Sequence, residues 1–120
     1  MRMLLRSLEC IAAGLLLAAC AMGQPAAEEQ SNPVGRNEQA IAEGHELFNR
    51  TCTVCHGMNG TATDRAPALG GGRSYVIRTD AGIFEAIQKG IPGSAMPASS
   101  LQPMDIWKIV AYMRAGFPNK

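Results

Sequence analysis

The sequence predicts a small all-α domain. Three segments carry apolar residues at steps of three and four, the period of one face of an amphipathic helix, and they span residues 38–50, 80–88 and 103–115. Strand-like alternation is nearly absent, and the stretches between these segments are rich in glycine and proline. We therefore expect three to five short helices within residues 38–120.

The first expected helix, residues 38–50, has a narrow apolar face. Its apolar or small members are Ile41, Gly44, Leu47 and Phe48. A glycine in a helix interior costs about 1 kcal/mol of helix propensity. Gly44 therefore favours a position where this helix packs closely against another element.

The other two helices are marked by residues at their ends. Asp80 is a candidate N-cap for the second helix, and Gly90 is a suitable terminator. The third helix has Pro103 at its first position and Gly116 just past its end, which is the usual asymmetry of the two residue types. Its apolar face consists of Ile106, Ile109, Val110 and Met113.

Cys52, Cys55 and His56 form the pentapeptide Cys-Thr-Val-Cys-His, a spacing typical of a c-type haem attachment site. Two intervening residues place both sulfurs on one side of a single turn, where they can form thioethers with the porphyrin vinyl groups. The adjacent imidazole then lies over the ring centre and can ligate the iron. One covalent haem c is the expected cofactor, and it would enlarge the core of a small domain with few aromatic residues.

Two other interpretations of the cysteine pair fit the sequence less well. A thioredoxin-like redox pair would need a βαβ pattern around it. A structural zinc site needs four ligands, and the chain has only four cysteines and two histidines. Cys10 and Cys20 lie in or beside an N-terminal apolar run that does not belong to the expected domain.

Residues 1–19 have the pattern of a secretory signal peptide. Arg2 and Arg6 precede an uncharged apolar run over residues 11–19. The run is too short for a membrane-spanning helix, which needs about 20 apolar residues. The mature protein is therefore expected outside the cytoplasm, on the periplasmic side of a bacterial membrane.

The sequence Leu-Ala-Ala-Cys that ends at Cys20 resembles the lipobox of bacterial lipoproteins. That resemblance implies that Cys20 is lipidated and becomes the first residue of the mature chain, so that the protein is anchored to the membrane. Cleavage nearby, for example after Ala21, would instead give a soluble periplasmic protein.

Residues 20–37 are small, polar and proline-containing without an apolar period, which predicts a flexible tether. The expected domain then spans residues 38–120. Residues 1–19 contain two of the 11 basic and one of the 10 acidic residues, which leaves nine of each in the mature chain. Nothing in this balance suggests a nucleic-acid-binding protein, which would show a clustered basic face.

With these motifs, the chain resembles bacterial class I cytochromes c, which are small all-helical proteins built around one haem. In that family an N-terminal helix with a Gly-x-x-x-Phe pattern crosses a C-terminal helix that carries aliphatic residues and a tyrosine. Gly44 to Phe48 match the first of these helices, and residues 109–113 match the second. The resemblance covers about residues 40–116, and it implies that these positions serve packing and not redox chemistry.

The resemblance also implies a methionine as the second axial ligand, in a loop well after the attachment site and just before a proline. Met96 and Pro97 fit, about forty residues beyond His56. The other methionines beyond the signal peptide lie in the tether, too close to His56 or in the last helix, and they are Met22, Met58, Met104 and Met113. His45 is the only other histidine, so ligation by two histidines is formally possible. Its charged neighbours favour a surface position instead.

The family further implies a proline carbonyl that accepts the second ring N–H of the ligating histidine, which orients the ring and raises its basicity. Pro67 lies at the matching distance after His56. Candidate donors to the haem propionates, among which the sequence does not choose, are Arg73, Tyr75 and Trp107.

A histidine and methionine ligand set leaves no open position at iron, and methionine favours the reduced state. The expected function is thus one-electron transfer, without catalysis, in an extracytoplasmic respiratory or dehydrogenase-linked chain. Its redox partners would be an upstream dehydrogenase or quinol-oxidising complex and a downstream oxidase or cytochrome. Two alternatives remain open: a haem subunit of a periplasmic dehydrogenase complex, and a gas-binding or peroxidatic protein if Met96 dissociates easily.

Overall fold

The computed structural model describes residues 31–69 and 78–117. These residues form helices and loops without a strand, which confirms the all-α prediction. The elements are α1 (Glu38–Thr51), α2 (Thr53–His56), the short 3-10 helix η1 (Met58–Gly60), α4 (Asp80–Lys89) and α5 (Pro103–Arg114). Among them, no helix combines the length and the apolar character needed to cross a membrane.

α1 begins and ends within one residue of its predicted bounds. The side chain of Asn37 caps its start, since Oδ1 accepts from the backbone N–H of Gln39 at 2.9 Å and of Ala40 at 3.3 Å. The acidic Glu38 lies in the first turn and the basic Arg50 in the last, which suits the helix dipole at both ends.

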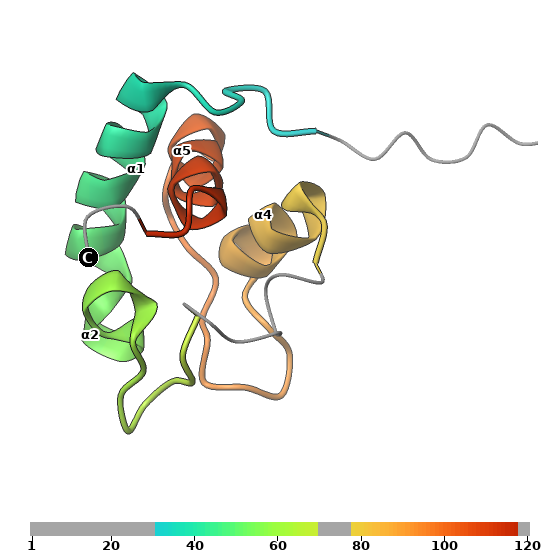
Figure 1. The fold of residues 1–120 in the computed structure, drawn as a ribbon. Coiled ribbons are helices and arrows are strands. Elements are labelled where there is room, and N and C mark those ends of the chain that lie inside the picture. Colours follow the sequence, from blue (N-terminus) through green and yellow to red (C-terminus); the bar gives the residue numbers. More distant parts are fainter. Residues whose placement is uncertain (1–30, 70–77, 118–120) are drawn as a thin grey trace, which may run out of the picture.

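α1 and α5 touch backbone to backbone at Gly44, and Figure 1 shows α5 lying between α1 and α4. A Cβ atom added to Gly44 would lie 2.1 Å from the carbonyl oxygen of Lys108 and 3.0 Å from the Cβ of Tyr112. Only a residue without a side chain fits there, which confirms the close packing predicted for this position.

The core is built on α5, which buries seven of its side chains, namely Ile106, Trp107, Ile109, Val110, Ala111, Tyr112 and Met113. An aromatic cluster lies beside the crossing. The Phe48 ring centroid is 5.6 Å from that of Tyr112 and 5.4 Å from that of Phe117. Tyr112 and Phe117 meet edge to face at 5.2 Å, a favourable geometry for aromatic rings.

The Tyr112 hydroxyl fixes the turn that follows α2. It donates to Asn59 Oδ1 at 3.0 Å, and burial raises the pKa of this tyrosine above its ordinary value. Asn59 lies in η1 with a φ of 54°, in the left-handed region that asparagine tolerates better than most residues. A residue of α5 therefore positions a segment more than fifty residues earlier in the chain.

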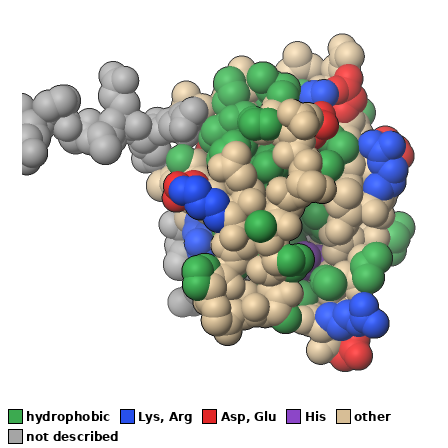
Figure 2. Space-filling model, turned by 180° about the vertical axis from the view of Figure 1, so that it is seen from behind, with side chains coloured by type: hydrophobic (Ala, Val, Ile, Leu, Met, Phe, Trp, Pro, Cys, Tyr) green, Lys and Arg blue, Asp and Glu red, His purple; other side chains and the backbone are tan. Residues whose placement is uncertain are grey.

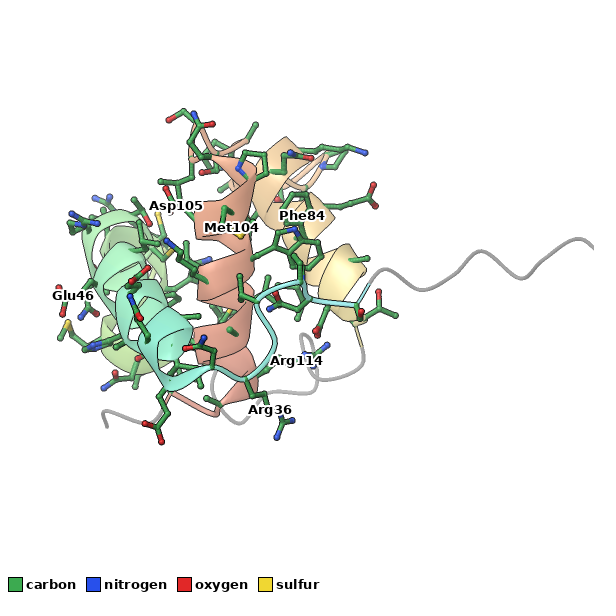
Figure 3. All side chains as sticks on the ribbon, turned by 90° about the horizontal axis from the view of Figure 1, so that it is seen from above. Arg36, Glu46, Phe84, Met104, Asp105 and Arg114 are labelled. Atoms are coloured by element: carbon green, nitrogen blue, oxygen red, sulfur yellow. The ribbon has the colours of Figure 1, made fainter. Side chains whose placement is uncertain are left out.

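α4 is capped by Thr79 and not by Asp80, the predicted cap. Thr79 Oγ1 accepts from the backbone N–H of Gly82 at 3.0 Å. Asp80 is instead the first helical residue, and its Oδ1 pairs with Arg114 Nε at 2.6 Å, at the end of α5 seen in Figure 3. Two residue types that both make good caps stand side by side here, so the sequence alone did not distinguish them.

An aromatic stack joins α4 to α5. The ring centroids of Phe84 and Trp107 lie 4.3 Å apart with an interplanar angle of 22°, and Figure 3 shows Phe84 on the side of α4 that faces α5. Trp107 is buried, while Phe84 is half-buried against the core.

The segment just before α1 contacts the domain, although the tether prediction included no such contacts. Asn32 Nδ2 donates to the carbonyl oxygen of Trp107 at 2.9 Å, and Val34 packs against the core. The predicted signal peptide, the first part of the predicted tether and Cys20 lie outside the described residues.

His45 is more enclosed than its charged neighbours suggested. Its ring is half-buried, with the centroid 5.0 Å from that of Tyr112, and its Nε2 lies 2.9 Å from Asn49 Nδ2. Tyr112 of α5 covers one side of the ring, a contact that the sequence around His45 does not predict.

The crossing at Gly44 should carry much of the stability. We expect Gly44→Val to lower the free energy of unfolding by about 1–3 kcal/mol, because its side chain must displace the α5 backbone. Phe48→Ala should lower it by about 3–5 kcal/mol, the usual loss for a buried aromatic. Urea unfolding of the holoprotein measures both, with Ala42→Val at an exposed position of α1 as control. A Gly44→Val loss no larger than that of the control would contradict the contact.

Candidate haem site

The attachment motif continues directly from α1. Cys52 caps the end of α1 and begins the next turn: its N–H donates to the Phe48 carbonyl at 2.8 Å, and its own carbonyl accepts from the His56 N–H at 2.9 Å. Both cysteines are half-buried free thiols on this turn. The helical turn predicted from the spacing is therefore present, and α1 fixes its position.

Side-chain hydroxyls hold the backbone of the motif. Thr51 Oγ1 donates to the Leu47 carbonyl at 2.6 Å, and Thr53 Oγ1 donates to the Asn49 carbonyl at 2.7 Å. From the following loop, the Thr63 hydroxyl donates to the Cys55 carbonyl. The turn is thus bonded to the helix before it and to the loop after it.

The two thiols differ in their surroundings. Cys52 packs against the hydrophobic core, and burial raises the pKa of its thiol, so it is protonated at neutral pH. Thr51 Oγ1 lies 3.4 Å from its sulfur. Cys55 lies one turn on, in the same short helix.

His56 carries an unsatisfied polar atom that fits a metal ligand. Its Nδ1 is buried and has no hydrogen-bond partner among the described residues. A metal-bound histidine usually donates its second ring N–H to an acceptor, so Nδ1 is the nitrogen that would do so, and Nε2 is left for iron. Pro67 is exposed and its carbonyl does not accept this N–H here, so its role stays a prediction.

Met96 lies in a tight loop that closes on itself. The Ile91 N–H donates to the Met96 carbonyl at 3.2 Å, and the Met96 N–H donates to Ser94 Oγ at 3.2 Å. Ser94 in turn donates to the Ile91 carbonyl from both its N–H, at 3.1 Å, and its hydroxyl, at 2.8 Å. The Met96 side chain is half-buried against the core.

Gly90 lets this loop fold back on the end of α4. Its φ is +72°, and a Cβ there would lie 2.8 Å from the Met96 carbonyl oxygen, the Pro97 carbonyl carbon and the Ala98 nitrogen. The sequence marked Gly90 only as a helix terminator. Its spacing of six residues from Met96 is the signal that could have pointed to a role in the loop.

The structure brings the motif and the methionine loop to one end of the molecule, as Figure 1 shows for α2 and the loop before α5. Cys52 and Met96 both pack against the same core, together with Leu69 and Leu101. The thiols, imidazole and thioether are the donor set of a c-type haem. Within residues 31–69 and 78–117, no three His, Cys, Asp or Glu side chains gather as a metal cluster, so these residues offer no zinc site.

The remaining candidates are placed elsewhere. Trp107 lies inside the core and stacks on Phe84, and Arg73 and Tyr75 lie outside the described residues. Met58 and Met104 are exposed, and Met113 is buried in α5. Met96 is therefore the one methionine of the described residues that is half-buried in a loop.

Comparison with known proteins supports the assignment. The profile of the family described as cytochrome c oxidase, cbb3-type, subunit III matches residues 39–113. Cytochrome cL from the marine methylotrophic bacterium Methylophaga aminisulfidivorans is 31% identical, with a TM-score of 0.63 over 71% of this chain and 58% of that one. Cytochrome cL from Hyphomicrobium denitrificans is 29% identical, with a TM-score of 0.55 over 62% of this chain and 46% of that one.

The chain thus spans about half the length of these two cytochromes. The c-type cytochrome KustC0563 is closer in size: it is 28% identical, with a TM-score of 0.52 over 60% of this chain and 94% of that one. None of the curated proteins compared with the chain matches it significantly. The family match covers the helices and both cysteines, and the chain therefore belongs to the c-type cytochrome family described as cytochrome c oxidase, cbb3-type, subunit III, with its haem attached through Cys52 and Cys55.

Proposed function

We propose that this protein is an exported one-electron carrier whose haem iron is ligated by His56 and Met96. The observation that carries the proposal is that two hydrogen-bonded segments pack against one core: the Cys52 to His56 turn bonded to α1, and the Met96 loop folded back over Gly90. When bound, the haem supplies a one-electron couple between Fe(II) and Fe(III).

The chain's own residues would limit the iron to electron transfer. The His56 imidazole and the Met96 thioether would hold the iron and would leave no ligand position for a substrate. A thioether ligand favours the reduced state and raises the potential. Because both ligand loops are held by backbone hydrogen bonds and by α5, oxidation and reduction would need little rearrangement.

The carrier would accept electrons from a dehydrogenase or a quinol-oxidising complex and deliver them to an oxidase or another cytochrome. Redox partners of this kind form small, short-lived interfaces. The pattern of residues 1–20 supports export and a lipid anchor on Cys20 at the periplasmic side of the membrane.

Covalent attachment gives the first test. The purified protein should carry one haem per chain that survives acid-acetone extraction and stains on denaturing gels, because thioethers at Cys52 and Cys55 do not dissociate. Intact mass spectrometry measures the added mass, and the Cys52→Ala/Cys55→Ala variant should lose it. Haem that extracts freely from the unaltered protein would rule the assignment out.

Ligation by Met96 gives the second test. The ferric protein should show the weak far-red sulfur-to-iron charge-transfer band. The ferrous protein should bind carbon monoxide poorly. Met96→Ala should remove the band, lower the midpoint potential and admit carbon monoxide, because only His56 then remains as a ligand. Met113→Leu should keep the band, since such core swaps usually cost less than about 1.5 kcal/mol. Rapid carbon monoxide binding by the unaltered protein would favour a gas-binding role instead.

Substitutions at two glycines distinguish an effect on the position of the Met96 loop from an effect of backbone strain alone. Gly90 and Gly93 both have positive φ, at 72° and 76°, but a Cβ at Gly93 would meet nothing within 4 Å. Gly90→Ala should push the Met96 backbone away and reduce the far-red band by about half or more, whereas Gly93→Ala should lose only the conformational cost of about 1–2 kcal/mol. Equal bands in the two variants would show that Gly90 does not position the ligand.

Lipid anchoring is tested in cells. Cys20→Ser should move nearly all of the protein from the membrane to the soluble periplasmic fraction and abolish labelling by fatty acid, because the residue that would carry the lipid is gone. The haem spectrum should not change, since this residue lies outside the haem domain. An unaltered protein that is already soluble and unlabelled would point to ordinary signal-peptide cleavage.

A further inference from the structure

The two segments that contain the proposed iron ligands carry no ionisable carboxylate, amine or guanidinium. Residues 51–63 and 90–103 contain no Asp, Glu, Lys or Arg. We call the exposed residues of these two segments the neutral face. In Figure 1, α2 and the turn of the loop between α4 and α5 lie at the same end of the molecule. Arg50 and Asp64 flank the first segment along the chain, and Lys89 and Asp105 flank the second.

Two large hydrophobic side chains project from this face on either side of His56. Val54 of α2 is 66% exposed, and Met58 of η1 is 62% exposed. Single exposed apolar residues are ordinary on protein surfaces. These two, however, are the most exposed large hydrophobic residues of the described chain, and both lie within two residues of the proximal ligand.

Several charged groups on the helices are paired with one another. Lys108 Nζ lies 2.7 Å from Glu43 Oε2, Lys89 Nζ lies 2.8 Å from Glu85 Oε1, and Arg114 pairs with Asp80. Figure 2 shows a face of the molecule on which charged side chains lie toward the margin, and hydrophobic or uncharged groups fill the centre. The ionisable residues that flank the two segments, Arg50, Asp64, Lys89 and Asp105, balance in charge. We therefore expect little net field to steer a charged partner to the neutral face.

We propose that the neutral face is the docking surface for a redox partner whose own redox centre opens onto an uncharged, apolar surface. The inference rests on the proposed carrier function and adds how the partner is recognised. Val54 and Met58 would form the centre of the contact, because the cores of interfaces are depleted in charge and enriched in methionine. Encounter would then depend on apolar contact and hardly on ionic strength, unlike charge-steered association.

A second copy of this cytochrome is a suitable probe, because it presents such a face itself. In a mixture of reduced and oxidised protein, the Fe(II) copy gives one electron to the Fe(III) copy, with no proton or other reactant involved. NMR line broadening of the holoprotein measures this self-exchange rate. We expect it to change less than about twofold between about 20 and 500 mM ionic strength, although screening becomes about fivefold shorter in range.

Charge placed on the face should create the salt dependence that the native protein lacks. Val54→Lys/Met58→Lys should slow self-exchange about tenfold at about 20 mM and regain most of the rate at about 500 mM, because like charges then oppose each other across the contact. The matched control Gln39→Lys/Ala42→Lys adds the same charge to exposed positions of α1, with Ala42 about 15 Å before Cys52 along the helix. It should stay within about twofold of the native rate.

Three results would overturn the proposal: native self-exchange that changes severalfold with salt, equal slowing by the two lysine pairs, or a lysine pair on the face that has no effect. If that pair lowers haem content, Val54→Ser/Met58→Ser replaces it and should slow exchange at all salt concentrations, since apolar contact is lost without added charge; an unchanged rate would likewise count against docking here. A redox titration carried out first distinguishes failure of the carrier function from failure of the docking surface. A protein without a reversible couple refutes the carrier function itself, whereas a reversible couple with salt-dependent exchange refutes only the docking surface.

Discussion

The backbone contact between α1 and α5 at Gly44 is the constraint on which the other contacts of the domain depend. A Cβ at this position would lie 2.1 Å from the Lys108 carbonyl oxygen, so the two helices lie closer than any side chain would allow. α1 runs without a loop into the attachment turn, because Cys52 is both the end of α1 and the start of α2. The crossing therefore fixes the position of Cys52, Cys55 and His56 and also contributes to the stability of the fold.

α5 also supports both segments that contain the proposed ligands, one directly and the other through α4. Tyr112 holds Asn59 just after the attachment turn, and Trp107 stacks on Phe84 of α4, whose end at Gly90 supports the methionine loop. One helix is thus the common reference for the two segments that would hold the iron. A common reference of this kind would keep the two segments in place in both oxidation states, which would suit a carrier.

Local patterns predicted the local structure. The period of apolar residues placed the three longer helices within one residue of their bounds, and Pro103 and Gly90 stand at the helix ends as expected. What the sequence did not reveal are contacts between distant segments. The Asn32 bond to Trp107, the cover of Tyr112 over His45 and the approach of Gly90 to the Met96 loop join residues whose neighbourhood exists only after folding. The ligand roles of Met96 and Pro67 came from family resemblance, and the structure supplies a loop for the first but no bond for the second.

The distribution of charge connects this architecture with the proposed function. Ion pairs lie on the helices, where Lys108 bridges Glu43 of α1 and Asp105 of its own helix, while the loops that would hold the ligands are uncharged. The uncharged loops place no carboxylate beside the thioether and the imidazole that could stabilise the more positive ferric state. They would therefore favour the reduced state of the iron, which a methionine ligand also favours. The same absence of charge leaves Val54 and Met58 as the features that a partner can recognise next to the haem. Ligand chemistry and partner recognition would then be consequences of one sequence property, the lack of ionisable residues in two short loops.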